Sequence, residues 1–288
     1  MLFLLPSCWL HRSHPYLCIR SLTGIACISQ LLFSFSTASG QTFSTGYRAT
    51  RLRLLPNTSI YFPEALSEQG VTGGYSRIHP TQFPIDVAVT WDELGSPSRL
   101  PVTGTYVSAG VLGFLPDGTP VGNRTLPADS PDPGFFEADS FTELPNTGLG
   151  GSAISGNSDF IIGQTSHPTA VVGVSRSIAT IWNNSGQHLI SGLEGVSSTG
   201  QSGNGDGVYI GITYDFSASD AVYGGFIGRN GTATRLAFPG FPETRGFEIN
   251  DDGWIAGSWE TTGERARGYT ARYDLDTGAQ EIHDLGLF

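Results

Sequence analysis

The sequence predicts an all-β repeat protein, a β-propeller of five blades with about four short strands in each blade. Three observations carry this prediction. Five glycines recur at spacings of 48, 41, 48 and 46 residues, each glycine follows a polar turn and a short apolar strand, and apolar residues make up 39% of a chain that also contains 39 Gly. The recurring glycines are Gly74, Gly122, Gly163, Gly211 and Gly257.

Each repeat is expected to begin with a hairpin whose turn is rich in Asn, Asp, Ser and Gly. The clearest copies are residues 204–211 and 249–257. Asn and Asp favour turns because their side chains bond to nearby backbone, and Gly adopts positive φ at no steric cost. The other turns are expected at residues 67–70, 116–118 and 157–159. The recurring glycine after each turn is expected where two backbones approach closely.

A second hairpin is expected to complete each repeat. Its first strand alternates apolar and polar residues and ends in an aromatic residue, as at residues 87–92, 178–183 and 269–274. Alternation of this kind is typical of strands with one buried face. The recurring Trp91 and Trp182 are therefore expected to pack between neighbouring blades. The blades are expected at roughly residues 57–102, 103–146, 147–193, 194–238 and 239–288.

The ring is expected to close through the strand at residues 47–55, which resembles the last strand of a repeat, as at residues 280–285. This strand would pair into the final blade, and closure would remove the exposed sheet edges that invite aggregation. An open twisted array and a β-sandwich are the alternatives.

The first 40 residues have the composition of a secretory signal. Arg12 and Arg20 occur there without any acidic residue, an apolar run covers residues 22–35, and small residues follow up to Gly40. The sequence therefore predicts a signal region at residues 1–40, cleaved before Gln41 or after Ala38, and a single β-repeat domain at 41–288. A membrane anchor is disfavoured because the run is shorter than the ~20 residues that span a bilayer.

The charge and cysteine content exclude several classes of function. Every one of the 15 basic residues is Arg, two of them lie in the signal region, and all 26 acidic residues lie beyond it. An acidic, Lys-free surface does not neutralise phosphates, so nucleic acid is not an expected partner. The three Cys precede residue 41, which leaves the repeat domain without disulfides or a thiol nucleophile. A secreted, periplasmic or cell-surface monomer is expected, with no membrane span after signal removal.

The repeat resembles a known family. Ile249, Asn250, Gly253 and Gly257 match the "I-N-x-x-G-x-x-x-G" half of the bacterial HAF-repeat extracellular proteins. Residues 88–92 and 181–186 resemble the "H-A-F-L-W-x-x-G" half, and residues 284–286 its "D-L-G" ending. The name-giving His is absent, so the chain resembles a divergent member. The resemblance implies a secreted or surface repeat protein and transfers no catalytic residue.

No sequence motif selects a metal or a catalytic site. The acidic turns offer oxygen ligands suited to Ca²⁺ at Asn204, Asp206, Asp251 and Asp252, but they lack the spacing of an EF-hand loop. Ordinary hairpin turns are the expected role of these residues. The sequence contains no paired metal-binding His motif and no nucleophile elbow. Metal, cofactor and catalytic residues are therefore left unassigned, with Ca²⁺ as the one cofactor kept open.

The expected function is a binding or interaction scaffold for an unknown protein or glycan. Variable loops on a fixed frame usually carry function, and the loops after the first hairpins vary most. These loops are residues 76–86, 126–134, 165–172, 215–221 and 258–268. One alternative is a carbohydrate-active hydrolase or lyase, which would need two acidic side chains from different blades within ~10 Å of each other. A second alternative is a passive envelope component.

Overall fold

Every regular element formed by the described residues is a β-strand, as the sequence predicts. The computed structural model describes residues 17–21, 47–78, 85–102, 108–127, 130–146, 150–168, 175–215, 222–241, 243–260, 266–278 and 280–287. No helix in this part of the chain is long and apolar enough to cross a membrane.

The strands fall into groups of four consecutive antiparallel strands. Group 1 is β3 (Ile60–Leu66), β4 (Thr72–Ile78), β5 (Ile85–Trp91) and β6 (Pro97–Arg99). Group 2 is β7 (Ser108–Phe114), β8 (Pro120–Thr125), β9 (Pro131–Phe136) and β10 (Phe141–Glu143). A single parallel bridge between Asp86 and Ser108 joins these two groups into one eight-stranded sheet.

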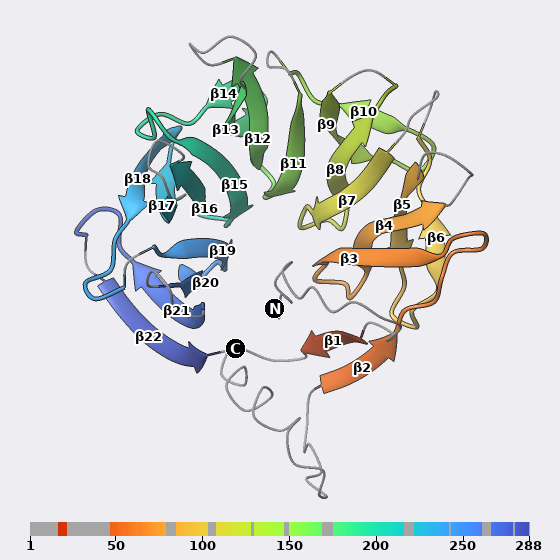
Figure 1. Cartoon of the computed structure of the whole chain (residues 1–288), viewed down its shortest axis with the longest axis horizontal. Coiled ribbons are helices and arrows are strands. Elements are labelled where there is room, and N and C mark those ends of the chain that lie inside the picture. The colour runs from red at the N-terminus through yellow and green to blue at the C-terminus, as the bar shows by residue number, and fades with distance from the viewer. Residues whose placement is uncertain are drawn as a thin grey trace, which may run out of the picture.

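Three separate four-stranded sheets follow. Group 3 is β11 (Gly151–Gly156), β12 (Phe160–Pro168), β13 (Ser175–Asn183) and β14 (Gly186–Leu189). Group 4 is β15 (Ser197–Gly203), β16 (Val208–Asp215), β17 (Val222–Arg229) and β18 (Thr232–Leu236). Group 5 is β19 (Arg245–Ile249), β20 (Trp254–Trp259), β21 (Arg267–Tyr273) and β22 (Gln280–Leu287). The groups are arranged around a centre, with the first strand of each innermost (Figure 1).

The recurring glycines lie where the second strand of a group crosses closest to the first. A Cβ added to Gly163 would lie 1.9 Å from the backbone oxygen of Ser152, and one added to Gly211 would lie 2.1 Å from that of Thr199. The corresponding distances at Gly74, Gly122 and Gly257 are 2.0, 1.9 and 2.0 Å. Real Cβ atoms are not found this close to backbone, so the prediction of close approach is confirmed.

A β-bulge accompanies each of these contacts. The register of the first strand shifts between Pro63 and Ala65, Val111 and Gly113, Ala153 and Ser155, Gly200 and Ser202, and Gly246 and Glu248. A bulge increases the local twist and bends the strand. The glycine pairs with the residue just before the bulge each time, so the same combination of glycine and bulge is repeated in every group.

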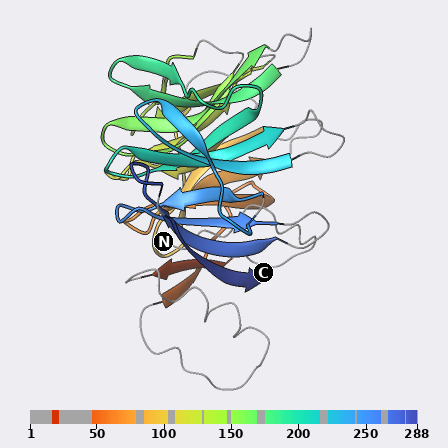
Figure 2. The ribbon, with the colours of Figure 1, turned by 90° about the vertical axis from the view of Figure 1, so that its left-hand side faces the viewer.

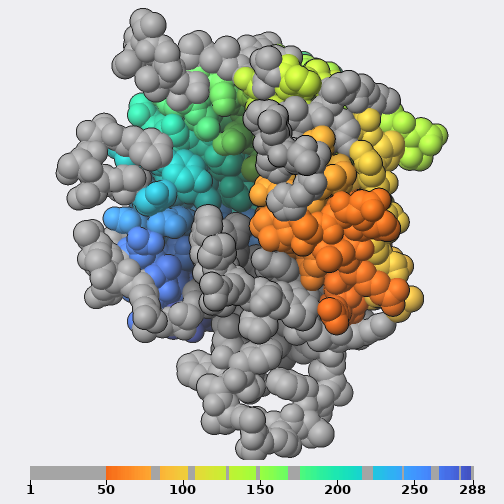
Figure 3. All heavy atoms as spheres, turned by 45° about the vertical axis from the view of Figure 1, so that its right-hand side comes forward, coloured from red at the N-terminus to blue at the C-terminus, as the bar shows by residue number. Residues whose placement is uncertain are grey.

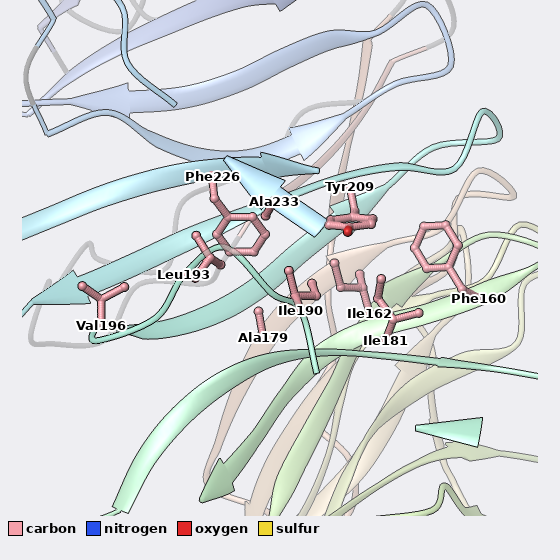
Figure 4. Close-up of a cluster of buried hydrophobic side chains, with 10 residues drawn as sticks. All are labelled: Phe160, Ile162, Ala179, Ile181, Ile190, Leu193, Val196, Tyr209, Phe226 and Ala233. Atoms are coloured by element: carbon pink, nitrogen blue, oxygen red, sulfur yellow. The ribbon is translucent and has the colours of Figure 1, made fainter. Parts of the chain in front are cut away.

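The buried apolar side chains form separate clusters between neighbouring groups. Figure 4 shows the cluster between groups 3 and 4, in which Ile162 and Ile181 face Tyr209 and Phe226. A second cluster lies between groups 4 and 5 and contains Ile210. Each group therefore buries its two faces against different neighbours, as expected for a repeat array.

The prediction that residues 47–55 pair with the last strand is wrong. β2 (Tyr47–Arg51) pairs instead with β1 (Leu17–Ser21), which lies within the predicted signal region. The chain then covers the outer face of group 1, where Leu52 is buried with Trp91. The Nε1 of Trp91 donates a hydrogen bond to the carbonyl of Arg53 at 2.8 Å.

The same contact recurs in group 3 and explains the error. There the Nε1 of Trp182 donates to the carbonyl of Pro145 at 2.6 Å. Pro145 lies in the connection that precedes group 3, so the residues around Arg53 are the counterpart of a connecting segment. They are not the counterpart of a fourth strand.

Among the described strands, the last and first groups are not packed on each other as the other neighbouring groups are. The described strands pack group 1 on 2, 2 on 3, 3 on 4 and 4 on 5, whereas no comparable packing joins β19–β22 to β3–β6. β1 and β2 lie in this interval in Figure 1. Figure 3 shows atoms of group 1, in orange, and of group 5, in blue, on one side of the molecule.

The last group differs from the others on the face turned away from group 4. Ala256 and Thr270 are partners across β20 and β21 on that face, at the positions that Ile210 and Ile227 occupy in group 4. The neighbouring Trp254 stacks on His283 with ring centroids 5.7 Å apart. This terminal face is therefore smaller and more polar than its counterpart inside the array.

Candidate functional site

The strands run between two faces of the ring (Figure 2). We call one the turn face, because it carries the turn after the first strand and the turn after the third strand of each group. The opposite loop face carries the connection after the second strand and the connection between groups. Antiparallel pairing in every group fixes this arrangement.

Asparagine side chains link successive groups along the turn face. The Nδ2 of Asn157 donates to the carbonyl of Asn204, and the Nδ2 of Asn204 donates to the carbonyl of Asn250 at 3.1 Å. The side-chain oxygen of each Asn accepts a backbone N–H within its own turn, as Asn204 does from Val208 at 3.0 Å. Asn157 and Asn204 are buried, so these bonds satisfy polar groups that would otherwise be costly.

This geometry assigns the acidic turns to structure. Asn204 uses both ends of its amide for these bonds, one within its own turn and one to the next group. The carboxylate of Asp251 accepts the N–H of Gly205 at 2.8 Å and so joins groups 4 and 5. Asp206 and Asp252 are exposed. Across the described parts of the chain, no group of three or more His, Cys, Asp or Glu side chains is placed to hold a metal ion.

The turn face is nonetheless strongly acidic. The exposed carboxylates of its turns are Glu68, Asp92, Glu93, Asp117, Glu137, Asp139, Asp159, Asp206, Asp251, Asp252, Asp274 and Asp276. Several of them cap backbone N–H groups. Asp274 accepts the N–H groups of Asp276 and Thr277, and these bonds lower its pKa, that from Thr277 most.

The loop face carries a different recurring arrangement, in which an arginine lies between an aromatic ring and a carboxylate. The guanidinium of Arg77 lies 5.5 Å from the ring of Phe62 and binds Asp86 through two nitrogens, at 2.7 and 3.0 Å. Arg124 lies 5.1 Å from the ring of Phe141 and binds Glu143 at 2.9 Å.

Two further copies lie at groups 4 and 5. Arg245 lies 4.2 Å from the ring of Tyr223 and binds Glu260 at 2.8 Å. Arg267 lies 5.3 Å from the ring of Trp259 and binds Asp284 at 2.6 Å. Contact with a ring and with a carboxylate holds each guanidinium in one orientation.

Charge and burial shift the protonation of these groups. The hydrogen bond from Arg267 lowers the pKa of Asp284, and the bond to Asp86 raises the pKa of Arg77. Burial raises the pKa of Tyr214, whose ring packs against that of Tyr223. At neutral pH the loop face therefore presents ionised pairs beside neutral aromatic rings.

The loops expected to carry function adjoin these residues. Residues 79–84, 128–129, 169–172, 216–221 and 261–265 of those loops lie outside the described residues. Their strand ends are described and supply Arg77, Arg124, Tyr214, Trp259 and Arg267. Sequence analysis missed the arginine arrangement because its members come from different strands and do not occupy equivalent positions in the repeats.

Two carboxylates on innermost strands bear on the hydrolase alternative. Burial raises the pKa of Glu64, and burial raises that of Glu248 to about 8, opposed by a hydrogen bond of 2.9 Å from the Ser202 hydroxyl. Both carboxylates lie on first strands, Glu64 in group 1 and Glu248 in group 5.

Comparisons with known proteins identify the fold and no family. No protein-family model matches the chain, and no curated protein matches it. A solved structure from a study of two prolyl endopeptidases is similar, with a TM-score of 0.52 and 13% sequence identity. The match covers 82% of this chain but 36% of that one, so the chain spans about a third of the length of its structural neighbour. The likeness shows an all-β, propeller-like fold.

Proposed function

We propose that this chain is a secreted or surface-exposed β-repeat scaffold that binds a glycan or protein ligand on its loop face. The observation that carries the proposal is the set of four arginines, Arg77, Arg124, Arg245 and Arg267, each placed between a ring and a carboxylate on that face. Arg and aromatic residues are enriched at the energetic centres of binding interfaces. Positioned partners also reduce the entropy lost on binding.

The proposal includes a five-bladed propeller, with strand groups 1 to 5 as its blades. Groups 1 and 2 count as two blades because one parallel bridge is all that joins them as a sheet. Each group also carries its own glycine contact and its own bulge. Propellers commonly bind ligands with the loops at one end of the ring, in keeping with a site on the loop face.

Secretion and the relation to HAF-repeat proteins are part of the same proposal. They are supported by the composition of residues 1–40 and by the motif at residues 249–257, which forms the first hairpin of group 5. N-terminal sequencing of protein recovered from the medium or cell surface tests secretion. A start at Gln41 or Ser39 is expected, whereas an intact leader on cell-associated protein would contradict it.

A thermal-shift screen of the purified chain tests the binding function. We expect a glycan or protein ligand to raise the melting temperature because it binds the native state. The variant Arg245→Ala should weaken that effect, whereas Asp206→Ala on the turn face should not. Ca²⁺ and EDTA form separate arms of the screen. A shift with Ca²⁺ alone, or a ligand effect lost in Asp206→Ala but retained in Arg245→Ala, would overturn the proposal.

A further inference from the structure

We infer that the loop face at groups 4 and 5 is a binding site for a neutral oligosaccharide. The site consists of Tyr214, Tyr223, Phe241, Arg245, Trp259 and Glu260, and we call it the aromatic platform. The inference rests on the proposed function and names the ligand class of one part of the loop face.

Paired rings give the platform its apolar surface. Tyr214 and Tyr223 form an edge-to-face pair with centroids 5.5 Å apart, and Phe241 and Trp259 form another at 4.9 Å. All four residues are partly exposed. Rings held in this way offer apolar contact area with little further loss of side-chain entropy on binding. The C–H faces of a pyranose ring are suited to such surfaces.

Hydrogen-bonding groups lie directly beside the rings. The guanidinium of Arg245 contacts Tyr223, and its Nη2 binds Glu260. The Arg245 side chain is 20% exposed, and its bond to Glu260 comes from Nη2. The guanidinium fork therefore has further terminal N–H groups with which it can bind a ligand acceptor. Glu260, whose side chain is 31% exposed, can accept hydroxyl hydrogen bonds from the same ligand.

The charges of the platform favour a neutral ligand. Arg245 is already paired with Glu260, and the adjacent Arg267 is paired with Asp284. An anionic sugar would have to displace one of these carboxylates, and it would approach a chain whose net charge is −11. Hydroxyl groups, in contrast, can bind the remaining donors and acceptors without separating either pair.

The corresponding residues of group 1 are less suited to this role. Phe62 and Tyr75 stack there with centroids 4.7 Å apart, beside Arg77. Group 1 offers this ring pair beside its arginine, whereas groups 4 and 5 offer two ring pairs around Arg245, and Asp86 already binds both Nε and Nη2 of Arg77. We therefore assign the sugar site to groups 4 and 5.

Isothermal titration of the full chain tests the inference. The probes are neutral gluco- and xylo-oligosaccharides, an oligogalacturonate and a proline-rich peptide. We expect a neutral oligosaccharide to bind and Trp259→Ala to raise its Kd about tenfold or more. Tyr223→Leu keeps apolar bulk without the aromatic face and should act in the same direction. Trp254→Ala is the matched control, because Trp254 lies at the other end of the same strand, on the turn face.

The outcomes separate this inference from the proposed function. The inference is overturned if none of the neutral sugars binds, or if Trp254→Ala weakens sugar binding as much as Trp259→Ala and Tyr223→Leu do. If the peptide or oligogalacturonate binds instead, and Trp259→Ala weakens that binding, the sugar assignment fails while the loop-face function stands. If any probe binds equally to wild type and to Trp259→Ala, Tyr223→Leu and Arg77→Ala, both fail.

Discussion

The two faces of the ring are built from the same strands but by opposite means. On the turn face, short turns repeat one set of contacts, in which asparagine side chains join one group to the next. On the loop face, arginines meet aromatic rings at positions that differ from group to group. Repeated residues thus coincide with bonds that hold the array together, whereas varied residues coincide with partly exposed ion pairs.

Burial supports the same distinction. Asn157 and Asn204 are 6% and 4% exposed, whereas the carboxylates that bind the loop-face arginines are 19 to 50% exposed. Removing one partner from a buried hydrogen bond is far more destabilising than removing one from an exposed ion pair. The turn face should therefore determine stability, and the loop face should tolerate change unless a ligand is present.

The largest effect is expected from Gly163→Ala, which tests whether the repeated strand contacts determine stability. The new Cβ would lie 1.9 Å from the backbone oxygen of Ser152, so the two strands would have to separate. We expect a loss of about 3 kcal/mol or more in the free energy of unfolding, measured by urea denaturation. Gly110→Ala is the control, since its Cβ would meet its nearest atom at an ordinary 3.5 Å. Equal losses in the two variants would contradict the close-approach explanation.

Asn204→Ala should have the next largest effect. It leaves the N–H of Val208 and the carbonyl of Asn250 without their side-chain partner. A loss of about 2 kcal/mol is expected. Asp206→Ala, in the same turn but exposed, should change stability by no more than about 0.5 kcal/mol. If Asn204→Ala leaves the melting temperature unchanged, the turn face does not determine stability as we propose.

A pH effect is expected from Glu248. Its pKa of about 8 in the folded chain lies above the ordinary value of 4.5, so the native state holds a proton that the unfolded chain releases. Stability due to this group is therefore full below about pH 4.5 and falls as the pH rises towards 8. Glu248→Gln should remove that part of the decline and melt several degrees above wild type at pH 8. The control Glu137→Gln, in an exposed turn, should not raise the melting temperature at pH 8. If it does, the effect is not specific to Glu248.

The smallest effect is expected on the loop face itself. Asp284→Asn removes one charge of a partly exposed pair with Arg267, and we expect a change within about 1 kcal/mol at pH 7. Because Arg267 lowers the pKa of Asp284, this stabilisation is present at neutral pH and disappears as the pH falls through the folded-state pKa. Wild type and variant should therefore converge in acid, as thermal melts would record. If Asp284→Asn lowers the free energy of unfolding as much as Asn204→Ala does, the two faces do not differ in their contribution to stability.

The local structure of the repeats was predictable because it depends on neighbouring residues. Gly163 and Gly211 marked the sites of close approach, and the turns after the first strands lie where their Asn, Asp and Gly residues predict. Trp91 is buried, but the prediction that it packs between neighbouring blades is wrong, because it packs against Leu52 of the segment before group 1. Its hydrogen bond to Arg53 depends on how the preceding segment crosses group 1, which no periodicity encodes.

The candidate site was predictable only in its approximate location. The expected loops begin at the strand ends that carry Arg77 and Trp259, so they lie on the same edge of the ring as the candidate site. The pairing of Arg245 with Tyr223 joins different groups and depends on the angle between their sheets. Alternation within a strand predicts which face a side chain occupies, but not which side chain of the next group it meets.

The unequal packing of the groups has a consequence for how the molecule comes apart. Among the described strands, group 4 packs on groups 3 and 5, whereas group 5 packs on group 4. On the other face of group 5, the small side chains of Ala256 and Thr270 stand where group 4 pairs Ile210 with Ile227. We therefore expect amide hydrogens of group 5 to exchange faster than those of group 4, because fewer apolar contacts oppose its local unfolding.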